Sequence, residues 1–261
     1  MRLAFARSLL PWRSGPALIG GMKFPLLSAA VAFLLLARAG AQLALEPQSF
    51  ESEVTIKVGY HYLLTLPEGY DADPAKKWPL LVFLHGAGER GSDLNLLKKH
   101  GPPKLIAAGH KFEAVVVCPQ VPTGDSWNAY GVKALIDQVR KDRRIDDSRI
   151  YLTGISMGGF GTFETIAQYP DLFAAAVPIC GGPGANVVKF GAVKDLPIWI
   201  FHGGKDPVVP VAYSQMAYKW LQNMHAPNAK LTIYPEAQHD SWTKAYDDPS
   251  LWEWLFAQKK K

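Results

Sequence analysis

The chain has 261 residues, of which 48% are hydrophobic, so it can bury the core of one larger domain or of two small ones. Its formal charge of +5 comes from the N-terminus: residues 1–41 contain five basic side chains and no acidic one, which leaves 23 basic and 23 acidic residues in the remainder. A balanced chain lacks the basic face that a nucleic-acid partner requires, so we expect no nucleic-acid binding.

The first 41 residues have the pattern of an export signal. Counting from Met22, a lysine forms the charged start, residues 24–37 are an apolar run, and Ala39-Gly40-Ala41 has the small-x-small pattern of a cleavage site. The run is shorter than the roughly 20 residues that span a bilayer. We predict a signal peptide over residues 1–41, with Met22 as an alternative start, and a secreted or periplasmic mature chain from Gln42 without stable membrane association. A retained N-terminal anchor is the alternative.

The rest of the chain alternates between predicted strands and helices. Residues 51–66 alternate in polarity like two strands that meet at Gly59, whereas later strands are apolar throughout, as strands buried on both faces are. Further strands are expected over 79–84, 114–118, 149–155, 174–179, 197–201 and 231–234, and helices over 94–108 (interrupted at 101–103), 132–141, 157–168, 211–224 and 242–258. This order predicts one α/β domain over residues 42–261, with a mostly parallel central sheet and helices on both faces.

The segment Gly154-Ile155-Ser156-Met157-Gly158 lies where an apolar strand stops and a helix-compatible segment begins. Gly-x-Ser-x-Gly in that setting is the nucleophile-elbow pattern, in which a tight turn projects the serine hydroxyl above the edge of the sheet. The following helix directs its free N–H groups and the positive end of its dipole toward the same place. We therefore predict that Ser156 is a nucleophile.

A nucleophilic serine needs an imidazole to take its proton, and the imidazole needs a carboxylate to orient it. Among the seven histidines, His239 is the best candidate for the base because it follows the last predicted strand on a short loop. His85 and His202 precede glycines within strand-end turns, where we expect structural hydrogen bonds. Asp206 follows the penultimate strand, and Ser156, Asp206 and His239 then occur in the Ser…Asp…His order of the α/β hydrolases.

Two acidic residues near His239 in the sequence, Glu236 and Asp240, are the alternatives for the acid. Both are so close to His239 along the chain that orienting its far ring nitrogen from there would be awkward.

Two backbone N–H groups are expected to stabilise a developing oxyanion. One belongs to Met157, which follows the nucleophile and opens the helix. The other is expected from the glycine-rich loop over residues 85–91, with Ala87 as our choice and Gly86 as the alternative. Glu89 and Arg90 are expected to brace this loop, since acyl transfer needs neither charge.

Residues from about 51 to 258 resemble a lidless α/β hydrolase of the dienelactone hydrolase and phospholipase/carboxylesterase kind. They are also similar to the small secreted esterases grouped as prolyl-oligopeptidase-like "predicted peptidases". The motifs that carry the resemblance are His85-Gly-Ala-Gly-Glu-Arg-Gly91, Gly154-Ile-Ser-Met-Gly-Gly159, His202-Gly-Gly-Lys-Asp-Pro207 and His239-Asp-Ser-Trp242. The resemblance implies an α/β-hydrolase fold without a lid domain and a serine esterase with a Ser-Asp-His triad.

The resemblance also implies a sheet order in which the strands that end at Cys118 and Cys180 flank the two central strands. Three strand spacings place the two cysteines roughly 14 Å apart. That separation exceeds the limit of about 7 Å for a disulfide, so both are expected to be free thiols.

The leading functional hypothesis is a secreted serine hydrolase that cleaves carboxylic esters through an acyl-enzyme. Short-chain or carbohydrate-linked esters of the acetyl or feruloyl type are the expected substrates, and this last step rests on the resemblance. A serine peptidase of the prolyl-oligopeptidase type is the alternative, although about 220 mature residues leave no room for a substrate-gating domain. A catalytically inactive binding module on the same fold is a third hypothesis.

Three aromatic side chains, Trp127, Tyr130 and Trp242, are candidates for the walls of a substrate pocket, with packing in the core as the alternative for each. The sequence shows no metal-ligand cluster, phosphate-binding loop or nicotinamide fingerprint, so no metal or cofactor is expected. The expected partner is a small-molecule or carbohydrate ester; the sequence does not predict the oligomeric state.

Overall fold

A computed structural model describes residues 47–184 and 191–260. The strands in these ranges are β1 (His61–Thr65), β2 (Trp78–Leu84), β3 (Val115–Gln120), β4 (Ile145–Ile155), β5 (Ala175–Ile179), β6 (Ile198–Gly203) and β7 (Ala229–Tyr234). The α-helices are α1 (Gly101–Ala107), α2 (Ala129–Asp142), α3 (Met157–Gln168), α4 (Ala212–Asn223), α5 (Trp242–Tyr246) and α6 (Pro249–Ala257). Short 3₁₀ helices are η1 (Ala87–Glu89), η2 (Leu94–Lys99) and η3 (Pro170–Leu172). All of these elements belong to the unit Val54–Lys261.

The strands form one sheet in the order β1-β3-β2-β4-β5-β6-β7. β1 pairs antiparallel with β3, and the remaining neighbours pair in parallel. Because parallel neighbours point the same way, the carboxyl ends of β2 to β7 meet at one edge of the sheet. The residues that follow these strands are therefore brought together although they lie far apart in the sequence.

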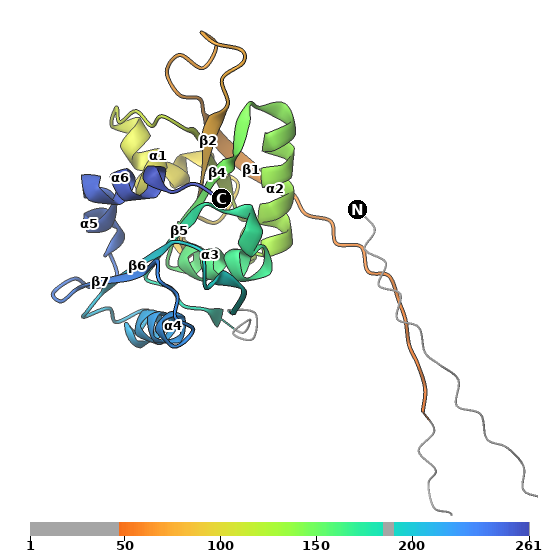
Figure 1. The fold of residues 1–261 in the computed structure, drawn as a ribbon, viewed down its shortest axis with the longest axis vertical. Helices are drawn as coiled ribbons and strands as arrows, with labels where there is room; N and C mark the ends of the chain where they lie inside the picture. The colour runs from red at the N-terminus through yellow and green to blue at the C-terminus, as the bar shows by residue number, and fades with distance from the viewer. Residues whose placement is uncertain (1–46, 185–190, 261) are drawn as a thin grey trace, which may run out of the picture. The chain divides into compact units, whose positions relative to one another are not determined.

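Helices cover both faces of the sheet (Figure 1). Alternate residues of the central strands belong to the two core clusters on these opposite faces. From β2, Leu80 and Val82 belong to the core cluster that also contains residues of α2, α3 and α4, while Leu81 and Phe83 belong to the cluster that contains residues of α5 and α6, with α1 packed against it. Each of these four side chains is fully buried. Both faces of the sheet are covered in this way, which explains why β2 and β3 are apolar without alternation.

The structure confirms the predicted α/β class, the mostly parallel sheet and the α/β-hydrolase arrangement of layers. The helix expected after Ser156 spans the predicted residues, as α3. β4 begins at Ile145, earlier than predicted, because Ile145 pairs with Trp78 ahead of the main register with β2. The strands β3 and β5 flank the central pair, and Cys118 and Cys180 are buried free thiols, as expected.

The prediction of a strand over residues 51–58 is wrong. Val54 and Ile56 are 78% and 61% exposed in a segment without regular structure, and only the second half of the expected hairpin forms a strand, β1. Alternating polarity describes a segment that suits one buried face, but it does not supply the partner strand or the apolar layer that would bury that face.

The predicted signal peptide, residues 1–41, lies outside the described residues. Within the described ranges, no helix is both long enough and apolar enough to cross a membrane. The connection between β5 and β6 is described for residues 180–184 and 191–197, and these residues contain no α-helix.

Candidate active site

Ser156 lies on the tight turn that joins β4 to α3. Its backbone has φ 53° and ψ −115°, a conformation that residues other than glycine rarely adopt. Its N–H donates to the carbonyl oxygen of Ile179 at 3.0 Å and to Sγ of Cys180 at 3.2 Å. The end of β5 therefore holds the strained turn in place, and the serine side chain is only partly buried.

The glycines on either side of Ser156 are required by close contacts between backbones. A Cβ on Gly154 would collide with the carbonyl group of Gly158, and a Cβ on Gly158 would collide with the carbonyl oxygen of Leu84 at the end of β2. The Gly-x-Ser-x-Gly pattern thus allows α3 to begin directly against the neighbouring strand ends.

The three residues predicted as nucleophile, acid and base lie within hydrogen-bond distance of one another. Nε2 of His239 is 3.0 Å from Oγ of Ser156, and Nδ1 of His239 is 2.7 Å from Oδ2 of Asp206. Because an ionised carboxylate only accepts, Nδ1–H donates to Asp206, which leaves Nε2 of a neutral imidazole free to accept from the serine hydroxyl. This arrangement prepares the hydroxyl for proton transfer to His239.

The carboxylate of Asp206 is fully buried and held by several donors. Its Oδ1 accepts from the N–H groups of Val208 and Val209 at 2.8 and 2.9 Å, and its Oδ2 is 3.2 Å from Nε2 of His202. Burial acts to raise the pKa of Asp206, but the hydrogen bonds from His239 and from the two backbone N–H groups outweigh it and hold that pKa below its ordinary value. The carboxylate thus stays ionised beside the imidazole.

The two alternative acids have other partners. Glu236 is exposed and pairs with Lys205, while Asp240 accepts from the N–H and the hydroxyl of Thr243. Neither is hydrogen-bonded to His239 in the described structure, in agreement with the sequence argument for Asp206.

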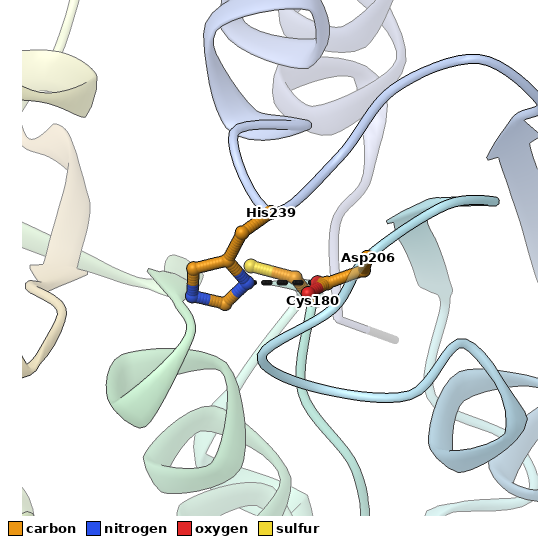
Figure 2. Close-up of side chains that lie close together, drawn as sticks. All are labelled: Cys180, Asp206 and His239. Carbon is orange, nitrogen blue, oxygen red and sulfur yellow. Dashed lines mark hydrogen bonds and ion pairs between the residues drawn. The ribbon is translucent and has the colours of Figure 1, made fainter.

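Cys180 lies beside Asp206 and His239 (Figure 2). The hydrogen bond from the Ser156 N–H to its sulfur was not predicted. Its Sγ, a carboxylate oxygen of Asp206 and a ring nitrogen of His239 lie within 4.8 Å of one another. Burial raises the pKa of the Cys180 thiol above its ordinary value. A hydrogen bond already joins Nδ1 of His239 to Oδ2 of Asp206. Within this cluster the imidazole of His239 and the carboxylate of Asp206 are thus already partners of each other.

His85 anchors the loop that follows β2. Its Nδ1–H donates to the carbonyl oxygen of Gly86 at 2.6 Å, and its Nε2 accepts from the N–H of Val121 at 3.0 Å. Burial lowers the pKa of His85 to about 4, so the ring is neutral at physiological pH. A neutral ring with both nitrogens engaged holds the loop and leaves no nitrogen for proton transfer.

The two N–H groups predicted for the oxyanion both open helices. Met157 is the first residue of α3 and Ala87 is the first residue of η1. The first N–H groups of a helix have no acceptor within that helix, so we expect both to be free to donate to another group. Gly158 packs against the carbonyls of Leu84 and His85, which brings the start of α3 against the loop that contains Ala87.

The structure separates the three predicted aromatic walls. Trp127 is buried, donates its Nε1–H to the carbonyl oxygen of His85 at 3.0 Å, and lines a pocket of about 340 Å³ together with Met157 and Phe160. Trp242 is buried against His239, with ring centroids 5.2 Å apart. Tyr130 is 55% exposed and does not line this pocket.

Comparisons with known proteins agree with this architecture. A family model described as phospholipase/carboxylesterase matches residues 125–249, which include all three residues of the hydrogen-bonded chain. A solved structure described as a thermostable esterase superposes with a TM-score of 0.65 at 37% identity, covering 76% of this chain and 59% of the other. The chain therefore has the α/β-hydrolase fold and is similar to phospholipases and carboxylesterases of that fold.

Two curated relatives of this chain are named as an acetylxylan esterase/xylanase and as a depolymerase. A bifunctional acetylxylan esterase/xylanase of Neocallimastix patriciarum is 34% identical over 178 residues, which are 63% of this chain and 25% of the relative. The poly(3-hydroxyalkanoate) depolymerase C of Paucimonas lemoignei is 28% identical over 186 residues, which are 65% of this chain and 41% of the relative. The chain thus spans less than half the length of either relative.

Three contributors to the site had no clear sequence signal. Cys180 reaches the nucleophile because its backbone turns through a positive φ of 42° at the end of β5, which hydrophobic patterning does not reveal. Nδ1 of His100 accepts a hydrogen bond from Nε1–H of Trp242, although the two residues lie more than a hundred positions apart in the sequence. Glu164 lines the pocket beside Met157. In the sequence, only its spacing of two helical turns from Ser156 would have indicated that it lies on the same side of the helix.

Proposed function

We propose that this chain hydrolyses carboxylic esters through a covalent acyl-enzyme. The observation that carries the proposal is the hydrogen-bonded chain from Oγ of Ser156 through His239 to Asp206, at a turn where the serine has the strained backbone of a nucleophile elbow. The esterase names of the relatives support the same reaction class.

In the first half-reaction, Oγ of Ser156 attacks the ester carbonyl carbon as its proton passes to Nε2 of His239. The negative charge that develops on the carbonyl oxygen is stabilised by the N–H groups of Met157 and Ala87, with the N–H of Gly86 as the alternative to Ala87. The C–O bond to the alcohol then breaks, and His239 returns the proton to the departing alcohol oxygen. Asp206 stabilises the imidazolium in between.

In the second half-reaction, water replaces the alcohol. His239 removes a proton from the water as its oxygen attacks the acyl carbon, and the tetrahedral intermediate collapses with return of a proton to Oγ of Ser156. The products are the free carboxylic acid and the regenerated serine. Each step uses residues of this chain and water alone.

We further propose short acyl groups and a carbohydrate-linked alcohol as the preferred substrate. The described residues that connect β5 to β6 contribute no α-helix beside the site, so we expect a long acyl chain to find little apolar wall beyond Trp127, Met157 and Phe160. Each buried CH₂ would otherwise contribute about 0.8 kcal/mol. The acetylxylan esterase relative supports an acetylated sugar polymer as the substrate class.

Two measurements on the purified chain test this proposal. A fluorophosphonate probe is expected to add once, at Ser156, as read by intact mass and peptide mapping, and Ser156→Ala is expected to abolish the adduct. Across 4-nitrophenyl esters from acetyl to palmitoyl, kcat/KM is expected to be highest between acetyl and butyryl, with acetylated xylan hydrolysed and peptides not. Absence of labelling would refute the serine mechanism, and preferential cleavage of peptides would favour a peptidase.

We also propose that the protein is exported by the segment 1–41, whose sequence pattern is that of a signal peptide. Mass spectrometry of the protein from its native host is expected to find Gln42 at the N-terminus. A product that retains the leader would contradict export with cleavage.

A further inference from the structure

The pocket beside the nucleophile contains a single acidic side chain. Its walls are Ser126, Trp127, Met157, Phe160, Gly161 and Glu164, with a volume of about 340 Å³. Met157 follows the nucleophile directly, and the N–H of Phe160 donates to the carbonyl oxygen of Ser156. The pocket therefore adjoins the residue next to Ser156, and we take it as the space for one side of a bound ester. Glu164 is two turns of α3 farther along.

Glu164 has no partner to neutralise it. Among the described residues its carboxylate makes no ion pair and no side-chain hydrogen bond, although the side chain is only partly exposed. The chain contains many exposed positions where a glutamate would cost less free energy, since a half-buried, unpaired carboxylate loses part of its hydration without compensation. Burial accordingly raises the pKa of Glu164.

A second carboxylate reinforces the negative field on this side of the site. Burial and, to a smaller extent, the carboxylates of Asp125 and Glu164 raise the pKa of Tyr60, so both acids act on one region. Arg90 contacts one lining residue of the pocket, because its Nη2 donates to Oγ of Ser126 at 3.3 Å. Arg90 does not form an ion pair with Glu164, so it leaves that carboxylate free to act on a ligand.

We propose that Glu164 selects substrates by charge, disfavouring esters that place a carboxylate or phosphate in this pocket and favouring neutral hydroxyl-bearing or cationic groups. This inference rests on the proposed ester hydrolysis and concerns the same site. A carboxylate accepts hydrogen bonds from hydroxyl groups and repels anions at the same distance. On a polysaccharide ester, the pocket would therefore accept neutral sugars and reject uronic acids.

Matched esters that differ only in charge test this selection. On the acyl side, mono-4-nitrophenyl succinate carries one negative charge, and methyl 4-nitrophenyl succinate is its neutral counterpart. On the alcohol side, 4-acetoxybenzoate is anionic, methyl 4-acetoxybenzoate is neutral, and 4-acetoxyphenyltrimethylammonium is cationic. The ratio of kcat/KM for the charged ester to kcat/KM for the neutral ester is taken within each protein at pH 8, so a general loss of activity cancels.

Glu164→Gln is expected to raise the anionic-to-neutral ratio about threefold to tenfold on the side of the ester that enters the pocket. It is expected to lower the cationic-to-neutral ratio when that side is the alcohol. Both changes should shrink at 0.5 M salt, which screens the charge. Glu164→Ala provides a second variant for the same comparison. Glu253→Gln, on the exposed side of α6, is the control for total charge and is expected to leave the ratios as in the wild type.

The possible failures are distinguishable. If the wild type hydrolyses neutral esters and the ratios on both sides are the same in wild type and Glu164→Gln, the inference about Glu164 is overturned and the proposed function stands. If the wild type hydrolyses none of the neutral esters, the proposed function fails and the inference fails with it. A ratio that changes equally in Glu253→Gln would also overturn selection by Glu164, because it would assign the effect to net charge.

Discussion

The ring of Trp242 packs edge-to-face on the imidazole of His239, with centroids 5.2 Å apart and an interplanar angle of 87°. On its other side, Nε1–H of Trp242 donates to Nδ1 of His100 at 3.2 Å, and Nε2 of His100 lies 3.7 Å from a carboxylate oxygen of the buried Glu89. Glu89 belongs to η1, the short helix that begins at Ala87. One tryptophan therefore connects the proposed base with the loop proposed to supply an oxyanion donor.

Trp242→Ala is expected to lower kcat on 4-nitrophenyl acetate by about tenfold to a hundredfold, because the imidazole loses the wall that fixes its position. Trp242→Phe keeps the aromatic contact and loses only the hydrogen bond to His100, so its loss should be smaller. Trp254→Ala, which removes an aromatic side chain packed on Trp199, is the control for lost stability. Equal kcat values for the wild type and Trp242→Ala would show that the contact does not position the base.

Ser156→Ala and His239→Ala are each expected to lower kcat by roughly 10⁴ to 10⁶, since nucleophile and base act as a unit. The double variant should be about as inactive as either single one. Circular dichroism and the thermal midpoint check that the fold is intact. Substantial activity in purified Ser156→Ala protein would be incompatible with the mechanism.

Asp206→Asn is expected to lower kcat by about 10⁴, because an amide N–H facing Nδ1 favours the wrong tautomer of His239. Glu236→Gln is the matched control: its carboxylate pairs with Lys205 at the surface, so it should cost little. Steady-state kinetics on the same ester compares the two variants. The opposite ranking would mean that the acid has been assigned to the wrong residue.

The elements around Ser156 could be predicted because local and global signals agree there. An unbroken apolar run indicates a strand buried on both faces, and Gly154 and Gly158 mark a place where backbones approach too closely for a side chain. In a parallel sheet the ends of β4, β6 and β7 must lie at one edge, so chain order alone placed Asp206 and His239 near the serine.

What could not be predicted depends on tertiary partners. Val54 and Ile56 have the spacing of a strand, yet no described strand pairs with them. The contacts between His100 and Trp242, and between Cys180 and the nucleophile, join loops from different parts of the chain. Periodicity assigns a residue to a face of its own element and carries no information about which loop will cover it.

A final prediction concerns stability rather than activity and follows from the buried His85. Its pKa is about 4 in the folded protein and 6.5 in an unfolded chain, so between these values the unfolded state binds more protons. The free energy of unfolding is therefore expected to decrease as the pH falls from about 6.5 toward 4, with His85 alone contributing up to about 3 kcal/mol. His202, whose pKa burial also lowers, acts in the same direction.

Urea unfolding at pH 7.5, 6 and 5 measures how the free energy of unfolding changes with pH. The variant His85→Gln cannot titrate at this position, so it should be less stable at pH 7.5 but its free energy of unfolding should change less with pH. The control His61→Gln, at an exposed position of β1, should show the same change with pH as the wild type. An unchanged slope in His85→Gln would show that other groups control the acid sensitivity.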